Sequence, residues 1–206
     1  MVRGMTLTDI AKRLNEDHSL LPPVFFMTDQ QAVSAPVGVI SRLPPGAAVI
    51  FRDYHHPERD RLGADLAVLC RDRGLIFLVA GDAGLAVKLK ADGVHLPEGL
   101  MAEAAVLRAS HPEWMLTVSC HDLAAVRRAE KIPLDAALVG PVFPTHSHPE
   151  TLSGEKPTLG LSGVRQMTAA TSLPLYALGG ITEKNASQLT GTGVVGIAAI
   201  RGFMSD

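Results

Sequence analysis

The sequence predicts an α/β protein, a (β/α)8 TIM barrel whose last outer helix is missing or reduced. Short apolar runs rich in Val, Leu, Ile and Phe recur at roughly 20 to 30-residue spacing, as βα units do. Most runs are continuous rather than alternating, which is typical of strands buried on both faces of a parallel sheet. Amphipathic segments separate them. Eight such units close into a barrel; the alternative, a doubly wound sheet, usually has fewer strands at this length.

Each of the eight predicted strands is an apolar run that ends in polar or glycine residues. They cover residues 24–29, 47–53, 75–81, 92–97, 115–120, 136–143, 173–180 and 194–200.

The segments between the runs have the pattern of outer helices. In residues 57–74, Leu62, Leu66 and Leu69 fall on one helical face, and Gly74 is suited to end the helix. Asp122 is suited to begin the helix predicted within residues 121–133. The other predicted helices lie within residues 100–112, 162–172 and 182–191, the last beginning at Thr182 or Glu183.

The two ends of the chain depart from a regular barrel. The sequence stops six residues after Ile200, so we expect the helix after the eighth strand to be missing or reduced. A helix over about residues 6–17 precedes the first strand. We expect it to cover the bottom of the barrel or part of the gap.

Composition narrows the function classes. The 206 residues are 47% hydrophobic, which favours one folded domain over residues 1–206 and excludes disorder. The formal net charge of −2 and 4% aromatic content favour neither nucleic acid nor a membrane surface as partner. No apolar run is long enough for a transmembrane helix, and no signal-peptide core is present. Cys70 and Cys120 have no metal or redox spacing, so we expect reduced thiols and a cytoplasmic location.

Function in such barrels collects at the carboxyl ends of the strands. The loop after the sixth strand holds Thr145, Ser147 and His148, which we expect at the rim of a pocket. Ser119 and His121 are two residues apart and therefore point to the same side, while Cys120 points away as a core residue. An alternative is that His121 is a core histidine bonded to a carbonyl.

Glycine-containing segments follow the last two strands. Gly179 and Gly180 lie in "LGGIT", and Ile200 and Arg201 lie in "AIRG". Backbone N–H groups and a helix N-terminus at these positions would suit a phosphate, and the loops after strands seven and eight are the usual phosphate site of this fold. The simpler alternative is that the two glycines only permit a tight turn.

Arg52 and several histidines are further polar residues whose roles we weighed. Arg52 is interpreted as an anion ligand, with a salt bridge to Asp53 as the alternative. His95 lies inside a predicted strand and is interpreted as structural. A metal site at His55, His56, His146 and His148 is not favoured, because no acidic or thiol partner stands at a matching spacing.

Six motifs in this order resemble one superfamily, that of thiamine-phosphate synthase and thiazole tautomerase. They are "KADGVHLP", "VSCHDLAAVRRAE", "GPVFPT", "GLSGVRQM", "YALGGITEKNA" and "GVVGIAAI", and the resemblance spans about residues 46 to 202. It implies a barrel that binds a thiazole phosphate, with the phosphate at Gly180 and the backbone around Ile200 and Arg201. It also implies that Ser119, His121 and Thr145 line the reaction site.

Several positions depart from the synthases of this superfamily, which join a pyrimidine pyrophosphate to a thiazole phosphate with Mg2+. Their Arg-x-Lys reads Arg52-Asp53-Tyr54 here, and their Asn-Asp after the third strand reads Ala80-Gly81. A second metal-binding Asp falls at about Leu100, and a Lys of the sixth loop falls at His148. Mg2+ requires hard oxygen ligands, and a leaving pyrophosphate requires neutralisation of its charge, so the absence of these groups counts against a synthase. The alternative is that Asp53 and Asp82 substitute for them by a shift of register.

Three functions stay open. The favoured hypothesis is a tautomerase-like enzyme in which His121 transfers a proton on a thiazole phosphate without metal or other cofactor. The first alternative is a divergent thiamine-phosphate synthase, which would use Mg2+. The second is a non-catalytic binder or sensor of a thiamine precursor. The expected partner is a small phosphorylated thiazole, and the sequence leaves a homo-oligomer open.

Overall fold

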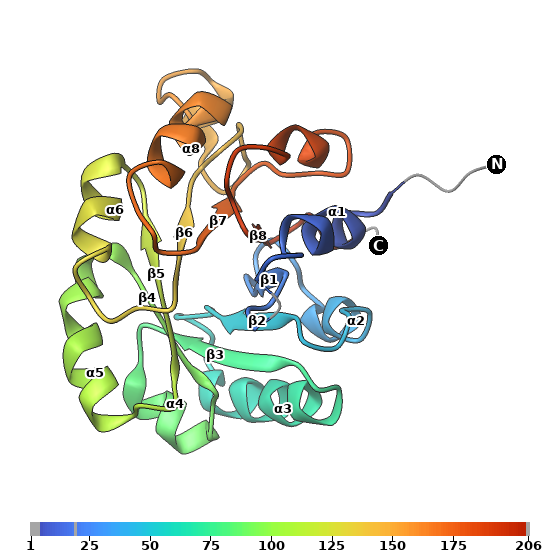
Figure 1. The fold of residues 1–206 in the computed structure, drawn as a ribbon. Helices are drawn as coiled ribbons and strands as arrows, with labels where there is room; N and C mark the ends of the chain where they lie inside the picture. Colours follow the sequence, from blue (N-terminus) through green and yellow to red (C-terminus); the bar gives the residue numbers. More distant parts are fainter. Residues whose placement is uncertain (1–4, 19, 205–206) are drawn as a thin grey trace.

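The computed structural model describes residues 5–18 and 20–204, and in it eight parallel strands close into a barrel in chain order (Figure 1). All eight predicted strands are present. They are β1 (Val24–Met27), β2 (Ala48–Phe51), β3 (Ile76–Ala80), β4 (Gly93–Leu96), β5 (Met115–Cys120), β6 (Ala136–Val139), β7 (Leu175–Leu178) and β8 (Gly196–Ala199).

Helices connect the strands and lie outside them (Figure 1). The α-helices are α1 (Leu7–Leu14), α2 (Pro36–Ile40), α3 (Arg59–Asp72), α4 (Ala83–Leu89), α5 (Ala104–Ser110), α6 (Leu123–Ala129), α7 (Pro149–Leu152) and α8 (Gly160–Thr168). Two 3-10 helices, η1 (Glu98–Glu103) and η2 (Ala186–Leu189), complete the set in the described ranges.

The closure of the barrel explains the continuous apolar runs. β1 pairs with both β2 and β8, so that Phe26 lies beside Val49 on one side and Ala199 on the other. All four residues of β1, β2, β4, β6 and β8 are buried, because the barrel interior covers one face and the helices cover the other. The TIM-barrel prediction is therefore confirmed.

The position after β8 holds no helix in the described part of the chain, as expected for a reduced last unit. Instead α1 contacts β8, β1 and η2, and it buries Leu7 and Ile10. The Asn15 side chain donates a hydrogen bond to the carbonyl of Val195 at 3.0 Å. A Cβ atom at Gly202 would lie 2.8 Å from the Leu7 side chain, so the last loop packs directly on α1. The N-terminal helix thus fills part of the gap.

Two other predicted helix positions had different outcomes. Asp122 does cap α6, because its side chain accepts a hydrogen bond from the Ala125 N–H at 2.7 Å. The helix predicted within residues 182–191, in contrast, is only the four-residue η2. The Asn185 side chain accepts from the Thr182 N–H at 2.8 Å and donates to the Gly180 carbonyl at 2.9 Å. These side-chain bonds fix the turn that connects β7 to η2.

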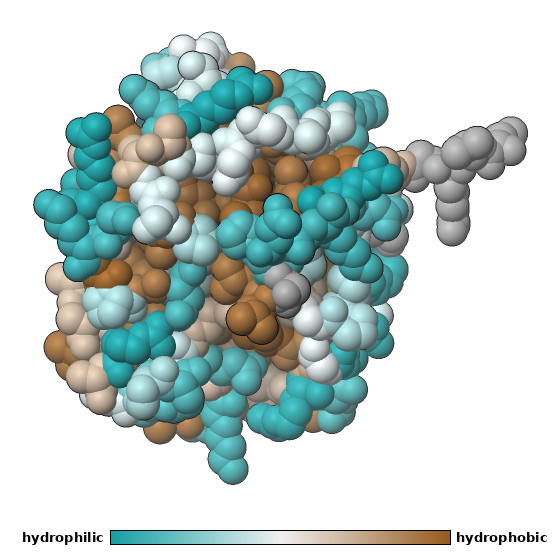
Figure 2. Space-filling view, in the orientation of Figure 1, coloured by the Kyte–Doolittle hydropathy of each residue, from teal (hydrophilic) through white to brown (hydrophobic). Residues whose placement is uncertain are grey.

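Polar and charged side chains cover much of the face in Figure 2, with apolar side chains mainly in the hollows between them. Within residues 5–18 and 20–204, none of the helices has the length and apolar character needed to cross a membrane.

Candidate functional site

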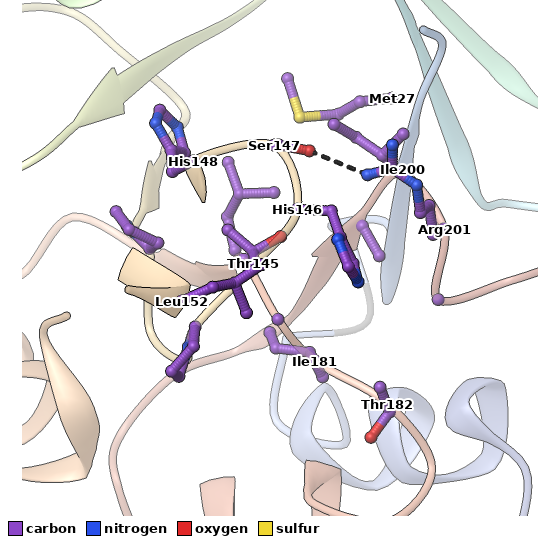
Figure 3. Close-up of a pocket in the computed structure, with 18 of the residues that line it drawn as sticks. Met27, Thr145, His146, Ser147, His148, Leu152, Ile181, Thr182, Ile200 and Arg201 are labelled. Atoms are coloured by element: carbon purple, nitrogen blue, oxygen red, sulfur yellow. Dashed lines mark hydrogen bonds between the residues drawn. The ribbon is translucent and has the colours of Figure 1, made fainter. Parts of the chain in front are cut away.

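A cavity of about 500 Å³ opens at the carboxyl ends of the strands, where the last three strands meet β1 and β2. Nearly all of the predicted site residues line it, and Figure 3 shows several of them around one opening. They are Arg52, His121, Thr145, Ser147, His148, Gly179, Gly180, Ile200 and Arg201. Ser119 does not line it.

The loop after β6 forms one wall, and hydrogen bonds hold it in place. Thr151 lies behind this loop: its hydroxyl accepts from the Thr145 N–H at 2.9 Å and donates to the His148 carbonyl at 2.6 Å. Arg201 donates to the Ser147 hydroxyl at 3.3 Å, which connects this loop to the end of β8 (Figure 3). The cavity wall is therefore built from two strand ends that are far apart in sequence.

Gly179 and Gly180 have left-handed backbone conformations, with φ of 96° and 66°. A Cβ atom at Gly180 would lie 2.4 Å from the Pro144 carbonyl oxygen, and one at Gly179 would lie 2.8 Å from the Pro141 Cα. Only glycine combines this conformation with so close an approach. Both glycines therefore have a packing role, and phosphate binding at their backbone stays a prediction.

Helix N-termini contribute less to the expected phosphate site than the sequence predicted. The loop after β7 leads only to the short η2, and no helix follows β8 in the described ranges. The fixed positive charges at the cavity are instead the side chains of Arg52, Lys184 and Arg201.

Arg52 has an ion-pair partner other than the one considered from the sequence. Its guanidinium contacts the Asp29 carboxylate at 2.5 Å, whereas the Asp53 carboxylate accepts from the Gln30 N–H at 2.6 Å. The interpretation of an Arg52–Asp53 salt bridge is therefore wrong. The ion pair with Asp29 holds Arg52 at the rim of the cavity, where it is still partly exposed.

His121 lies just beyond β5 and is held by the neighbouring strand end. Its Nδ1 is 3.1 Å from the Gly140 carbonyl, and its backbone N–H donates to Glu98 at 3.1 Å. A carbonyl oxygen only accepts, so Nδ1 carries the proton in this contact and Nε2 of the neutral ring keeps its lone pair. His121 is exposed and lines the cavity, so this geometry suits a base that faces a ligand.

Ser119 lies one layer deeper, in contact with a buried histidine. His95 Nε2 is 2.9 Å from the Ser119 hydroxyl, and His95 Nδ1 is 2.9 Å from the Thr117 hydroxyl. Burial, with a further contribution from the charge of Arg52, lowers the pKa of His95 to about 3. His95 is thus a neutral interior group that fixes Ser119, in agreement with its structural interpretation.

Both cysteines are free and buried, as expected for core residues. Burial raises the pKa of Cys120 to about 12, and that of Cys70 to about 12 as well. Thiols with such values stay protonated near neutral pH and are poor nucleophiles.

Sequence reasoning missed several cavity residues. Met27 at the end of β1 and Glu183 and Lys184 after β7 line the cavity, and so does His146, which was expected at the rim together with its loop. Lys184 could have been found, because it follows "LGGIT" in the loop after the seventh strand. Met27 carries no polar signal that would distinguish it from a core residue.

Comparisons with known proteins agree with this architecture. The model of the family described as thiamine monophosphate synthase matches residues 24–203. The chain belongs to this family. Among its relatives, the thiamine-phosphate synthase of Bacillus velezensis is 29% identical over 94% of this chain and 87% of the relative. That of Methanoculleus marisnigri is 33% identical over 78% of this chain and 76% of the relative.

Solved structures also show that this member of the thiamine monophosphate synthase family has the barrel fold. Thiamine phosphate pyrophosphorylase from Pyrococcus furiosus superposes with a TM-score of 0.72 at 29% identity, covering 92% of this chain and 88% of that one. Citrate synthase SbnG superposes with a TM-score of 0.64 at 14% identity, covering 95% and 92%, and so shares the barrel fold.

The magnesium ion implied for synthases of the family does not fit the residues present. Ala80, Gly81 and Leu100 stand at the positions expected to supply ligands, and none has a side-chain oxygen. The carboxylates nearby in sequence already have partners: Asp29 with Arg52, Asp53 with the Gln30 N–H, Asp82 with Arg59, and Glu98 with Arg128. Among the described residues no group of three or more His, Cys, Asp or Glu side chains is placed to hold a metal ion.

Proposed function

We propose that this chain is an enzyme of thiamine biosynthesis that joins a phosphorylated pyrimidine to a phosphorylated thiazole, the thiamine-phosphate synthase reaction. The observation that carries the proposal is the family membership over residues 24–203, together with relatives named thiamine-phosphate synthase. These names favour the synthase alternative over the tautomerase hypothesis that the sequence departures had favoured.

The cavity has features that this reaction requires. Its volume of about 500 Å³ is in the usual range of small-molecule sites. The thiazole phosphate is proposed to lie at the backbone of Gly179, Gly180 and Ile200, beside Arg201. Coupling releases pyrophosphate, whose charge must be neutralised. Arg52, Lys184 and Arg201 line the cavity and are the protein cations available for this.

Proton transfer on a carboxylated thiazole phosphate is the second candidate. It is favoured by one observation, the His121 ring whose Nδ1 contacts the Gly140 carbonyl and whose Nε2 is left as a base in the cavity wall. This reaction requires neither pyrophosphate release nor a metal ion. A binder or sensor without turnover is the third candidate, and it would use the same thiazole phosphate site.

The deciding experiment is a coupling assay. Purified protein is incubated with the pyrimidine pyrophosphate and the thiazole phosphate, with and without Mg2+, and thiamine phosphate is measured after oxidation to a fluorescent product. We expect thiamine phosphate to form in proportion to enzyme and time. Failure to form it, while thiazole phosphate binds in calorimetry, would contradict the synthase proposal.

In that event the proton-transfer candidate is tested by solvent deuterium exchange into the carboxylated thiazole phosphate. His121→Ala is expected to slow exchange by roughly 10²–10⁴-fold, the usual contribution of a general base, and to leave ligand affinity nearly unchanged. His55→Ala, an exposed histidine outside the cavity lining, is the matched control. If His121→Ala exchanges deuterium as fast as the unmodified protein, His121 is not the base. If the unmodified protein itself shows no exchange, the binder or sensor without turnover is the remaining candidate.

A further inference from the structure

The end of β3 carries an unusual arrangement around one arginine. Arg59, the first residue of α3, has a side chain that is only 15% exposed. Its guanidinium contacts the Asp82 carboxylate at 2.7 Å and donates to the Ala80 carbonyl at 3.2 Å. Ala80 is the position where the resemblance placed a metal-binding pair, so a protein cation lies beside the site where a metal ion was implied.

Aromatic rings hold this guanidinium from other directions. The Arg59 guanidinium carbon lies 5.5 Å from the centre of the Phe51 ring and 5.6 Å from the centre of the Tyr54 ring. Cations are attracted to such ring faces, most strongly where water is excluded. The position of Arg59 is therefore determined by an ion pair, a carbonyl and two rings, and not by one flexible contact.

Tyr54 in turn lies over the end of β3. A Cβ atom at Gly81 would lie 3.4 Å from the Tyr54 ring and 3.6 Å from the Pro97 ring, so Tyr54 covers Gly81 at ordinary contact distance. Burial raises the pKa of the Tyr54 hydroxyl, which stays protonated at neutral pH. Tyr54 also stands where the resemblance places a lysine of the synthases.

Both oxygens of the Asp82 carboxylate already have a partner in this arrangement. One oxygen accepts from Arg59, and the other accepts from the Leu85 N–H at 2.8 Å as the cap of α4. Mg2+ at Asp82 would compete with the charge of Arg59 and with the helix cap.

We propose that Arg59, Asp82 and Tyr54 form a unit built on an ion pair, without net charge, that occupies the β3–β4 side of the barrel mouth in place of bound magnesium. The chain then has no Mg2+ site there, and Arg59 is the positioning residue that holds Tyr54 and Asp82 in place. The consequence for catalysis rests on the proposed function: coupling would proceed without Mg2+, with the substrate charge met by Arg52, Lys184 and Arg201.

The first test measures Mg2+ binding directly. Full-length protein is treated with EDTA, dialysed and titrated with MgCl2 in a calorimeter, and Mn2+ is titrated separately by electron paramagnetic resonance. We expect no saturable binding of either ion in the millimolar range. Stoichiometric binding that is lost in Asp82→Asn would overturn the proposal.

The second test concerns the role of Arg59. Arg59→Gln is expected to lower the thermal unfolding midpoint and to increase quenching of Tyr54 fluorescence by acrylamide, because Tyr54 loses its partner. Arg61→Gln is the matched control, since Arg61 is 76% exposed and contacts only Glu58 across one helical turn. Equal effects in the two variants would reject a positioning role. If Arg59→Gln fails to fold, Arg59→Lys is used, which keeps the charge but not the planar fork.

The coupling assay with EDTA or Mg2+ distinguishes failure of the metal-free proposal from failure of the proposed function. Coupling that changes less than about twofold between EDTA and Mg2+ supports both. Coupling that requires Mg2+ supports the synthase and overturns the metal-free unit. Absence of coupling together with absence of Mg2+ binding rejects the synthase and leaves the metal-free unit in place.

Discussion

At the scale of single residues, the position of a side chain along its strand decided which site predictions matched the cavity. His121 and Ser119 were expected to point to the same side, but only His121 lies beyond the end of β5 and lines the cavity. Ser119 is one layer lower, where it meets His95. Period-two alternation gives direction but not depth, so Ser119 could not be placed from the sequence. Tyr54 and Arg59 were missed for another reason: no local pattern shows that a loop and a helix start will close over the neighbouring strand.

The buried His95 predicts a pH dependence of stability. Its pKa is about 3 in the folded protein, below the value of about 6.5 expected for an unfolded chain. Between these values the unfolded state binds more protons, so the free energy of unfolding falls as the pH falls from about 6.5 towards 3, by up to ~1.4 kcal/mol per pH unit. Urea unfolding at pH 7 and pH 4.5 measures this. The variant His95→Gln keeps hydrogen-bonding groups but does not titrate, so we expect its free energy of unfolding to change less with pH. The same pH dependence in both proteins would contradict the assignment of the effect to His95.

At the scale of elements, the sequence predicted where strands and most helices lie because apolar periodicity reports burial directly. It also predicted the helix before β1, although α1 is shorter than expected. The helix predicted within residues 182–191 is only η2, after a turn that the Asn185 side chain holds through Thr182 and Gly180. A hydrophobic pattern does not contain the geometry of such a loop.

Packing of α1 over the gap beside β8 predicts a large effect of a small truncation. Ile10 is 4% exposed, and Ile10→Ala is expected to lower the free energy of unfolding by about 2–5 kcal/mol, as is usual for core isoleucines. Glu16→Ala, on the exposed end of the same segment, should change it by no more than about 0.5 kcal/mol. Urea unfolding of both variants checks this, and similar midpoints would mean that α1 contributes little to the barrel.

At the scale of the whole molecule, the fold was predictable because eight apolar runs at regular spacing have few arrangements that bury all of them. The site could be predicted only as a general location at the strand ends, since many chemistries use this fold. The reaction depended on family resemblance, and there the departures at single positions led away from the synthase reaction that the names of the relatives favour.

A ligand that binds only the folded barrel should stabilise the whole molecule. Thiazole phosphate at about 100 times its dissociation constant adds ~2.7 kcal/mol. For a chain of this size that corresponds to a rise of roughly 5–11 °C in the thermal unfolding midpoint. The unphosphorylated thiazole alcohol at equal concentration is the control and should give a much smaller rise. Equal rises would indicate that the phosphate contributes nothing to binding.

The contact between α1 and β8 has a consequence for how the protein is made. The ribosome releases α1 well before β8 and the loop at Gly202, and both of these belong to the surfaces that bury Leu7 and Ile10. Throughout elongation the apolar face of α1 therefore lacks part of its final cover. Exposed apolar surface of this kind favours aggregation and chaperone binding, so the yield of this protein in cells should depend on chaperones acting until translation is complete.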